Sequence, residues 1–212
     1  MAKRLMFFVD FDGTISREDV CYTMVKTFAR EGWAELNTLW EEGTLSTGDC
    51  AQATLDLISA LPEELTAFFA RMEIDPAFPV FLQWAKEQNH PVYILSDGYA
   101  NYIDLILKRE RIDAEYYANI MEYREGWHIH MPHLNPECGK CGVCKQGKIA
   151  ELSHPDFTKI YIGDGYSDLC PARHSDMVFA KRTLADLCGQ EGIFVYNFQS
   201  FNDILSKMQE IF

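Results

Sequence analysis

The chain has few basic residues and no long hydrophobic segment. Its 212 residues include 19 Lys and Arg against 32 Asp and Glu, which gives a formal net charge of −13. Nucleic acids and anionic membranes bind clustered Lys and Arg, so this balance argues against both as partners. No stretch approaches the length that crosses a bilayer, and the apolar run before Asp10 is too short for a secretory signal. We therefore expect no membrane attachment and a small-molecule substrate.

The sequence also lacks internal repeats and low-complexity tracts, and its seven cysteines cannot all pair with one another. Without a secretory signal, an odd number of cysteines predicts reduced thiols in the cytoplasm. The hydrophobic residues, 48% of the chain, suffice for one sizeable core with a smaller appendage. A chain this acidic would repel an anionic phosphate ester, so any phosphate site must carry its own cation, from a metal or a lysine.

The hydrophobic pattern predicts an α/β fold with a parallel sheet. Short apolar runs predict buried strands at 5–9, 92–95, 160–162, 177–179 and 193–195. Amphipathic segments predict helices at 20–29, 34–40, 47–60, 63–72, 78–88, 101–109, 148–152 and 201–211, and a turn between 120–123 and 127–131 predicts a hairpin. We expect a core domain of 1–15 and 76–212, which includes the hairpin and cysteine loop at 120–145. The helical segment 16–75 is inserted into it.

Acidic, hydroxyl or glycine residues follow three of the predicted strands. They are Asp10-Phe11-Asp12-Gly13-Thr14, Ser96-Asp97-Gly98 and Gly163-Asp164-Gly165-Tyr166-Ser167-Asp168. Asp and Gly are ordinary turn residues, so any one of these segments alone carries little information. The carboxyl ends of parallel strands share one edge of a sheet, which is where open α/β sheets bind ligands. The three segments together therefore predict one site.

These motifs, in this order and with a lysine between the second and the third, resemble those of the haloacid dehalogenase phosphatases over nearly the whole chain. The resemblance implies a Rossmann-like parallel sheet with a small helical cap inserted after the first strand. It implies that Asp10 is the nucleophile that forms a phosphoaspartate and that Asp12 is the general acid and base. It further implies Mg²⁺ held by Asp10, the backbone carbonyl of Asp12, and Asp164, with Asp168 supporting these ligands from behind.

The same resemblance assigns the phosphate contacts. Thr14 and Ser96 would donate hydroxyl hydrogen bonds to phosphate oxygens. Backbone N–H groups of the first and second motifs, including those of Asp97 and Gly98, would donate to the same oxygens.

The family also needs one lysine to hold the phosphate and neutralise the surroundings of the nucleophile. Lys145 directly follows the cysteine loop and precedes a predicted helix, and it is the first candidate. Lys148 lies one helical turn further along and is the alternative.

The substrate class depends on finer resemblances. The cysteine loop from Cys138 to Lys145 resembles a shorter version of a loop in the methionine-salvage enol-phosphate phosphatases. A related loop, and the stretch from Gly163 to Pro171, are similar to those of the phosphoethanolamine/phosphocholine phosphatases. The helical insertion is similar to the cap of phosphoserine phosphatases, and Asp19 stands where those enzymes place a glutamate that contacts the serine ammonium. Ser96-Asp97-Gly98 departs from the Ser-Gly-Gly that is usual in the methionine-salvage and phosphoserine enzymes, and is closer to the phosphoamine group. We expect a small phosphorylated metabolite as substrate, of the methionine-salvage enol-phosphate type, with phosphoethanolamine, phosphocholine or phosphoserine as alternatives.

Cysteines repeat at every third position in the segment Cys138-x-x-Cys141-x-x-Cys144. With His133 as a fourth ligand, this spacing could hold Zn²⁺. The competing interpretation is a glycine-rich loop of reduced thiols packed near the entrance of the site. Two further functions stay open: a phosphotransferase that passes the phosphoryl group to an alcohol, and a non-catalytic zinc-binding interaction module.

Overall fold

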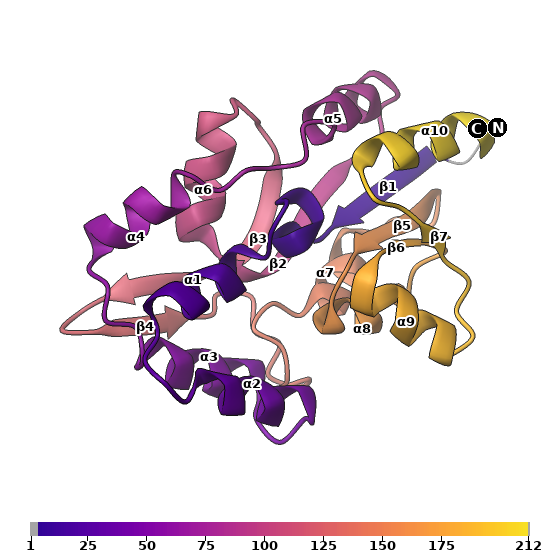
Figure 1. Cartoon of the computed structure of the whole chain (residues 1–212). Coiled ribbons are helices and arrows are strands. Elements are labelled where there is room, and N and C mark those ends of the chain that lie inside the picture. Colours follow the sequence, from indigo (N-terminus) through magenta and orange to yellow (C-terminus); the bar gives the residue numbers. More distant parts are fainter. Residues whose placement is uncertain (1–3, 212) are drawn as a thin grey trace.

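The computed structural model describes residues 4–211 and is built around a seven-stranded sheet of order β4-β3-β2-β1-β5-β6-β7 (Figure 1). All neighbouring strands are parallel except β3 and β4, which form the antiparallel hairpin. The predicted α/β fold with a mostly parallel sheet is therefore confirmed. The strands are β1 (Arg4–Val9), β2 (Val92–Tyr99), β3 (Glu115–Tyr123), β4 (Trp127–His130), β5 (Phe157–Gly163), β6 (Met177–Ala180) and β7 (Tyr196–Asn197).

Helices cover both faces of the sheet because the side chains of the central strand β1 alternate between two hydrophobic layers. Leu5, Phe7 and Val9 pack with residues of α5 (Phe78–Glu87), α6 (Ala100–Arg109) and α10 (Phe201–Ile211). Met6 and Phe8 pack on the opposite face with residues of α7 (Lys145–Leu152), α8 (Leu169–Ala172) and α9 (Arg182–Gln190). The carboxyl end of β1 is thereby held rigidly at the middle of the sheet.

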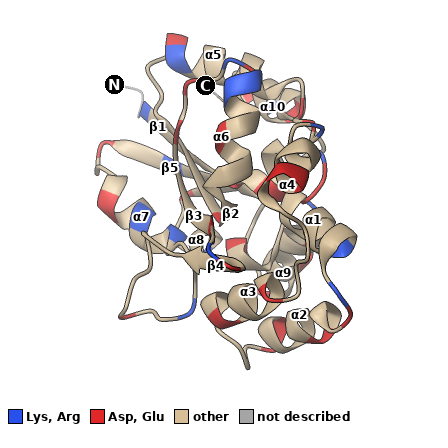
Figure 2. Ribbon diagram, turned by 90° about the vertical axis from the view of Figure 1, so that its left-hand side faces the viewer, with Lys and Arg blue, Asp and Glu red and all other residues tan. Residues whose placement is uncertain are grey.

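Four helices separate β1 from β2: α1 (Val20–Phe28), α2 (Trp33–Glu41), α3 (Thr47–Leu55) and α4 (Pro62–Phe69). Asp19 and Ser46 cap α1 and α3 by accepting hydrogen bonds from backbone N–H groups, and Pro62 begins α4. The two chain segments that enter and leave this insertion run side by side, joined by an antiparallel bridge between Ser16 and Ile74. Helices α2, α3 and α4 contain acidic residues and neither Lys nor Arg (Figure 2).

The hairpin of β3 and β4 extends the sheet alongside the insertion, and β4 contacts α3 (Figure 1). The side chain of Gln52 donates to the carbonyl oxygen of Trp127 at 3.1 Å and accepts from the N–H of Ile129 at 3.0 Å. The indole N–H of Trp127 donates to the carbonyl oxygen of Ala60 at 2.8 Å. These contacts fix the insertion against the edge of the core.

Some boundaries differ from the sequence predictions. The strand expected at 193–195 is wrong, because β7 consists of Tyr196–Asn197 and the side chain of Phe194 is 74% exposed. Helix α7 begins at Lys145, three residues earlier than predicted. Strand β2 continues through Ser96-Asp97-Gly98, with a register shift against β3 after Leu95, so the second motif lies within an irregular strand end. Between residues 4 and 211, no helix is long and apolar enough to span a membrane.

Candidate active site

The three motifs predicted to converge do so at the carboxyl ends of β1, β2 and β5. Asp10 follows β1, Asp12 lies in the irregular turn η1 (Phe11–Ile15), and Asp164 follows β5. Together with residues of the insertion they line a cavity of about 640 Å³. Asp10 and Asp164 are almost fully buried. The cavity therefore has a carboxylate-rich floor beneath walls formed largely by the insertion.

Lys145 lies directly against Asp10. Its Nζ is 2.7 Å from Oδ1 of Asp10 and 2.6 Å from Oδ1 of Asp168, and only 2% of its side chain is exposed. Burial and the charge of Asp168 raise the pKa of Asp10 well above its usual range, while the charge of Lys145 opposes the rise. The ammonium group therefore favours the ionised form of Asp10, the form able to act as a nucleophile.

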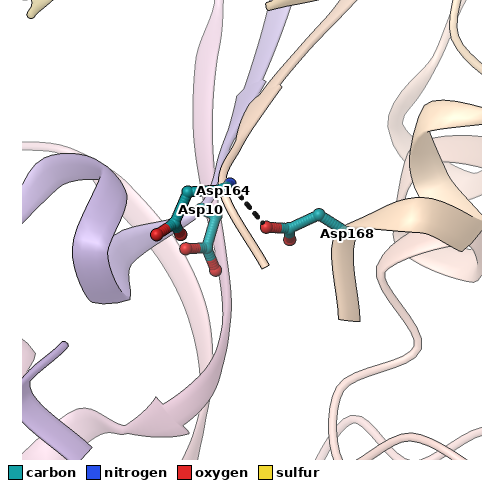
Figure 3. Close-up of side chains that lie close together, drawn as sticks. All are labelled: Asp10, Asp164 and Asp168. Atoms are coloured by element: carbon teal, nitrogen blue, oxygen red, sulfur yellow. Dashed lines mark hydrogen bonds between the residues drawn. The ribbon is translucent and has the colours of Figure 1, made fainter. Parts of the chain in front are cut away.

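Asp168 holds the floor of the cavity together. Its Oδ2 accepts hydrogen bonds from the backbone N–H groups of Asp164 and Gly165, both at 2.9 Å, and Figure 3 shows the first of these. Its Oδ1 accepts from Lys145 and from the hydroxyl of Tyr161. With both oxygens occupied in this way, Asp168 positions its neighbours.

Both oxygens of Asp12 are also bound. Oδ1 accepts from the backbone N–H groups of Val20 at 3.1 Å and Cys21 at 3.4 Å, at the start of α1. Oδ2 accepts from the hydroxyls of Tyr102 at 2.5 Å and Ser96 at 3.2 Å. Burial, followed by the charge of Asp19, raises the pKa of Asp12 to about 7, whereas the hydrogen bond from Tyr102 lowers it. A carboxyl group with such a pKa can both donate and accept a proton near neutral pH.

Asp164 contacts two side chains at the edge of the cavity. Its Oδ1 accepts a hydrogen bond from the hydroxyl of Thr14 at 3.1 Å, and its Oδ2 lies 2.9 Å from Nη1 of Arg182. Arg182 also donates to the carbonyl oxygens of Gly13 and Arg17. Gly13 has a φ of +75°, and a Cβ there would lie 2.5 Å from Oδ2 of Asp164, so the motif requires glycine at this position.

Lys148, the alternative lysine, points elsewhere. Its Nζ is 2.8 Å from Oε2 of Glu151 and lies over the ring of Tyr117. Of the two candidates, Lys145 is the one in contact with Asp10.

The cysteine loop does not form the predicted zinc site. In the described part of the chain, Asp10, Asp164 and Asp168 form the one group of three or more His, Cys, Asp or Glu residues whose possible ligand atoms lie within 4.8 Å of one another. His133, expected as the fourth ligand, packs edge-on against the ring of Tyr117. The loop Cys138–Cys144 instead binds its surroundings through backbone groups: the N–H of Thr47 donates to the carbonyl oxygen of Lys140 at 2.9 Å.

Asp97 anchors this loop to β2. Its Oδ1 accepts a hydrogen bond from the N–H of Val143 at 2.7 Å, and its carbonyl oxygen accepts from the side chain of Asn119 at 2.7 Å. Asp97 thus braces the backbone of the loop against β2. The loop directly precedes Lys145, so the contacts of Asp97 also help to fix the position of this lysine.

We expect Asp97→Ala to loosen the cysteine loop. Loss of the acceptor leaves the buried N–H of Val143 unpaired, which should lower the free energy of unfolding by about 1–2 kcal/mol. Urea denaturation measures this change, and limited trypsin digestion should show faster cleavage after the exposed Lys140. Asp113→Ala, at an exposed position, is the control. Equal stability and equal cleavage in the two variants would contradict the anchoring interpretation.

The carboxylates of the cavity floor suit a hard divalent cation. Asp10 and Asp164 offer anionic oxygen ligands, the donor type that Mg²⁺ prefers. The four carboxylates of Asp10, Asp12, Asp164 and Asp168 face two cations, Lys145 and Arg182, so two negative charges remain when all four are ionised. The oxygens of Asp168 are already engaged by Lys145, Tyr161 and two N–H groups. Each oxygen of Asp168 thus accepts two hydrogen bonds, whereas each oxygen of Asp164, and Oδ1 of Asp10, is bound by a single donor, so Asp10 and Asp164 are the better ligands.

Two residues of this site had no place in the sequence predictions. Tyr102 lies in a predicted amphipathic helix, where core packing explains an aromatic residue, and Arg182 follows β6 outside every motif. Arg182 has a φ of +51°, a conformation that residues other than glycine seldom adopt. No pattern in a single sequence indicates that either side chain reaches the cavity floor.

Comparison with known proteins agrees with this geometry. Residues 7–173 match the model of the haloacid dehalogenase-like hydrolase family. The chain is 31% identical to a 2-hydroxy-3-keto-5-methylthiopentenyl-1-phosphate phosphatase of Bacillus velezensis, over 100% of this chain and 92% of that protein. It is 30% identical to the protein of the same name from Geobacillus kaustophilus, over 100% and 98% of the two chains.

Solved structures of phosphoserine phosphatases share the fold. A phospho-aspartyl intermediate analogue of one such enzyme superposes with a TM-score of 0.70 at 16% identity, covering 97% of this chain and 99% of that chain. A substrate-bound complex gives a TM-score of 0.72 at 15% identity, covering 98% and 99%. The chain belongs to the haloacid dehalogenase-like hydrolase family and is a phosphatase.

Proposed function

We propose that this phosphatase hydrolyses a small phosphorylated metabolite through a phosphoaspartate formed on Asp10. The observation that carries the proposal is the buried contact between Asp10 and Lys145, at the bottom of a cavity that also exposes Asp12 and Asp164. An ionised carboxylate beside a fixed ammonium group can attack a phosphoryl group whose charge the same ammonium offsets.

The two half-reactions use Asp10 and Asp12 in turn. An oxygen of Asp10 attacks phosphorus while the bond from phosphorus to the leaving oxygen breaks, and Asp12 gives its proton to that oxygen. Water then attacks the phosphorus, its proton passes to Asp12, and the bond between phosphorus and Asp10 breaks. Inorganic phosphate leaves, and both aspartates return to their starting states.

The remaining site residues hold and neutralise the phosphoryl group. We assign the phosphate contacts to the hydroxyls of Thr14 and Ser96 and to the backbone N–H groups around Gly98, all near the carboxylates of the cavity floor. Mg²⁺ would be held by Asp10, the carbonyl oxygen of Asp12, and Asp164. Its positive charge would offset the two negative charges that Lys145 and Arg182 leave unneutralised. Asp168 would keep Lys145 and the backbone of Asp164 in place.

We further propose that residues 16–75 act as a cap that selects the substrate. Their contribution to the cavity wall includes Tyr22, Trp33, Trp40 and Cys50. A wall of aromatic rings suits a thioether, because sulfur makes favourable contacts with ring edges. The relatives from Bacillus velezensis and Geobacillus kaustophilus are named as phosphatases of a thioether, 2-hydroxy-3-keto-5-methylthiopentenyl 1-phosphate. A methionine-salvage enol phosphate is therefore our first candidate substrate.

A phosphorylated amine is the second candidate. Asp19 and Glu41 line the cavity, and helices α2, α3 and α4 contribute neither Lys nor Arg to it. Aromatic rings and carboxylates together also suit an ammonium group. Phosphoethanolamine, phosphocholine and phosphoserine therefore belong in any test.

The experiment measures release of inorganic phosphate from a panel that contains the enol phosphate 2-hydroxy-3-keto-5-methylthiopentenyl 1-phosphate and the three phosphorylated amines. We expect one compound to exceed the others by at least about tenfold in kcat/KM, a difference that a few pocket contacts supply. Chelation with EDTA should remove the activity and added Mg²⁺ should restore it. Equal, slow turnover of every compound would contradict a selective cap, and full activity after chelation would contradict the metal assignment.

We also propose that the protein works in a reducing compartment such as the cytoplasm. All seven cysteines are free thiols, although Cys138, Cys141 and Cys144 lie close together along the chain. Free thiols persist where glutathione keeps cysteines reduced. Mass determination of protein taken directly from cells, with thiols blocked at lysis, would show seven modified cysteines if this is correct.

A further inference from the structure

Tyr102 is buried in the core yet reaches the cavity floor through its hydroxyl. It lies in α6, none of its surface is exposed, and its ring packs against Phe11 and Phe69. Its hydroxyl donates to Oδ2 of Asp12 at 2.5 Å. The core thus fixes the ring of Tyr102, and the hydroxyl contacts one carboxyl oxygen of Asp12.

The other contacts of Asp12 are weaker or come from outside the core. Oδ1 is bound by N–H groups at the start of α1, which belongs to the insertion, at 3.1 and 3.4 Å. The hydroxyl of Ser96 lies 3.2 Å from Oδ2 and also accepts from the N–H of Gly98. Among the described residues, Tyr102 makes the shortest hydrogen bond to this carboxyl group and makes it from a rigid element.

The backbone leaves room for this contact at Gly98. A Cβ on Gly98 would lie 1.7 Å from the hydroxyl oxygen of Tyr102 and 2.3 Å from Oδ2 of Asp12. No side chain can occupy that space while the two groups remain bonded. The contact between Tyr102 and Asp12 therefore requires glycine at position 98.

We propose that Tyr102 is a positioning residue that orients Asp12 for proton transfer to and from the reacting oxygens. The inference rests on the proposed function, in which Asp12 serves both half-reactions. The phenol can donate to Oδ2 both when Asp12 is ionised and when its other oxygen carries the proton, so one contact holds Asp12 in either state. Proton transfer needs the carboxyl group within hydrogen-bond reach of the leaving oxygen, and a freely rotating group meets that condition less often.

The test compares Tyr102→Phe with wild type on phenyl phosphate and 4-nitrophenyl phosphate. The two substrates have similar shapes, but phenoxide, with a pKa of about 10 for its parent phenol, needs a proton as it leaves, whereas 4-nitrophenoxide leaves readily without one. We expect kcat/KM, which reports the half-reaction that forms the phosphoaspartate, to fall about tenfold for phenyl phosphate, a fraction of what general acid catalysis contributes, and to change less than about twofold for 4-nitrophenyl phosphate. The ratio of the two rates is independent of the folded fraction of the enzyme.

Tyr161→Phe is the matched control, because Tyr161 is another fully buried tyrosine whose hydroxyl binds a site aspartate, Asp168, at 2.5 Å. We expect any loss in this variant to be the same for both substrates. An equal loss for both substrates in Tyr102→Phe, or no loss, would overturn the proposal. Asp12→Asn separates the two hypotheses: if it shows the leaving-group bias and Tyr102→Phe does not, the proposed function stands and only the inference about Tyr102 fails.

Discussion

Replacing Asp10 with Asn should reduce phosphate release from the best substrate by about 10⁴-fold or more, as expected when an enzyme loses its nucleophile. The amide keeps the size of the side chain and can still contact Lys145, but it cannot attack phosphorus as a carboxylate does. Acid-quenched reactions with labelled substrate should trap a phosphorylated protein in the wild type and none in the variant. The initial rate of phosphate release and the label bound to protein are the two measurements.

Asp156→Asn is the control for this substitution, because Asp156 lies on the surface with its side chain 70% exposed, paired with His154. It should retain the wild-type rate and the protein-bound label. An Asp10→Asn variant that kept more than about a hundredth of the wild-type rate would contradict covalent catalysis at this residue, given the contribution expected of a nucleophile.

Lys145→Met should lower kcat by about 10²–10³-fold, the range seen when one group that stabilises transition-state charge is removed. Methionine retains much of the length and apolar body of lysine but leaves Asp10 and Asp168 without the ammonium group that now lies within 2.7 Å of each. The charge of Lys145 also counteracts the rise in the pKa of Asp10. Its loss should leave more Asp10 protonated at a given pH and so reduce the fraction of active nucleophile.

The matched substitution is Lys148→Met, one helical turn along α7, whose partner is Glu151. We expect its kcat to stay within about twofold of wild type, since Lys148 pairs with Glu151, whose side chain is 61% exposed, and an ion pair with a solvated partner contributes little. If Lys148→Met is inactive and Lys145→Met is active, the phosphate contact must be assigned to Lys148 and our assignment to Lys145 is wrong. Steady-state kinetics of the two variants under the same Mg²⁺ concentration decides between them.

The parts of the fold that follow from local hydrophobic pattern were predictable. The run from Leu5 to Val9 is buried on both faces, and this property of a central parallel strand is visible in the sequence as an uninterrupted apolar segment. The convergence of Asp10, Asp12 and Asp164 follows from parallel topology, because each ends or follows a strand at the same edge. Sheet geometry alone brings these motifs together, whatever their separation along the chain.

Other features depend on contacts that no periodicity encodes. Ile193-Phe194-Val195 has the composition of a strand. Strand β6 pairs instead with Tyr196 and Asn197, and the side chain of Phe194 is exposed. The cysteine spacing satisfies a zinc pattern, yet the loop is shaped by backbone hydrogen bonds to Asp97 and Thr47. In both segments tertiary contacts, distant in sequence, decide the local conformation.

The bridge between Ser16 and Ile74 has a consequence for how this protein could change over evolution or by engineering. The insertion leaves and rejoins the core at two adjacent points, so a different module with closely spaced ends could replace residues 17–73 without moving β1 or β2. The carboxylate-rich floor of the cavity and the wall that the insertion forms can then be exchanged as separate parts. The contacts of Gln52 and Ala60 with the hairpin only hold the insertion in place. Helix α1, by contrast, supplies the N–H groups that bind Asp12, so any graft must bring a helix start to the same place.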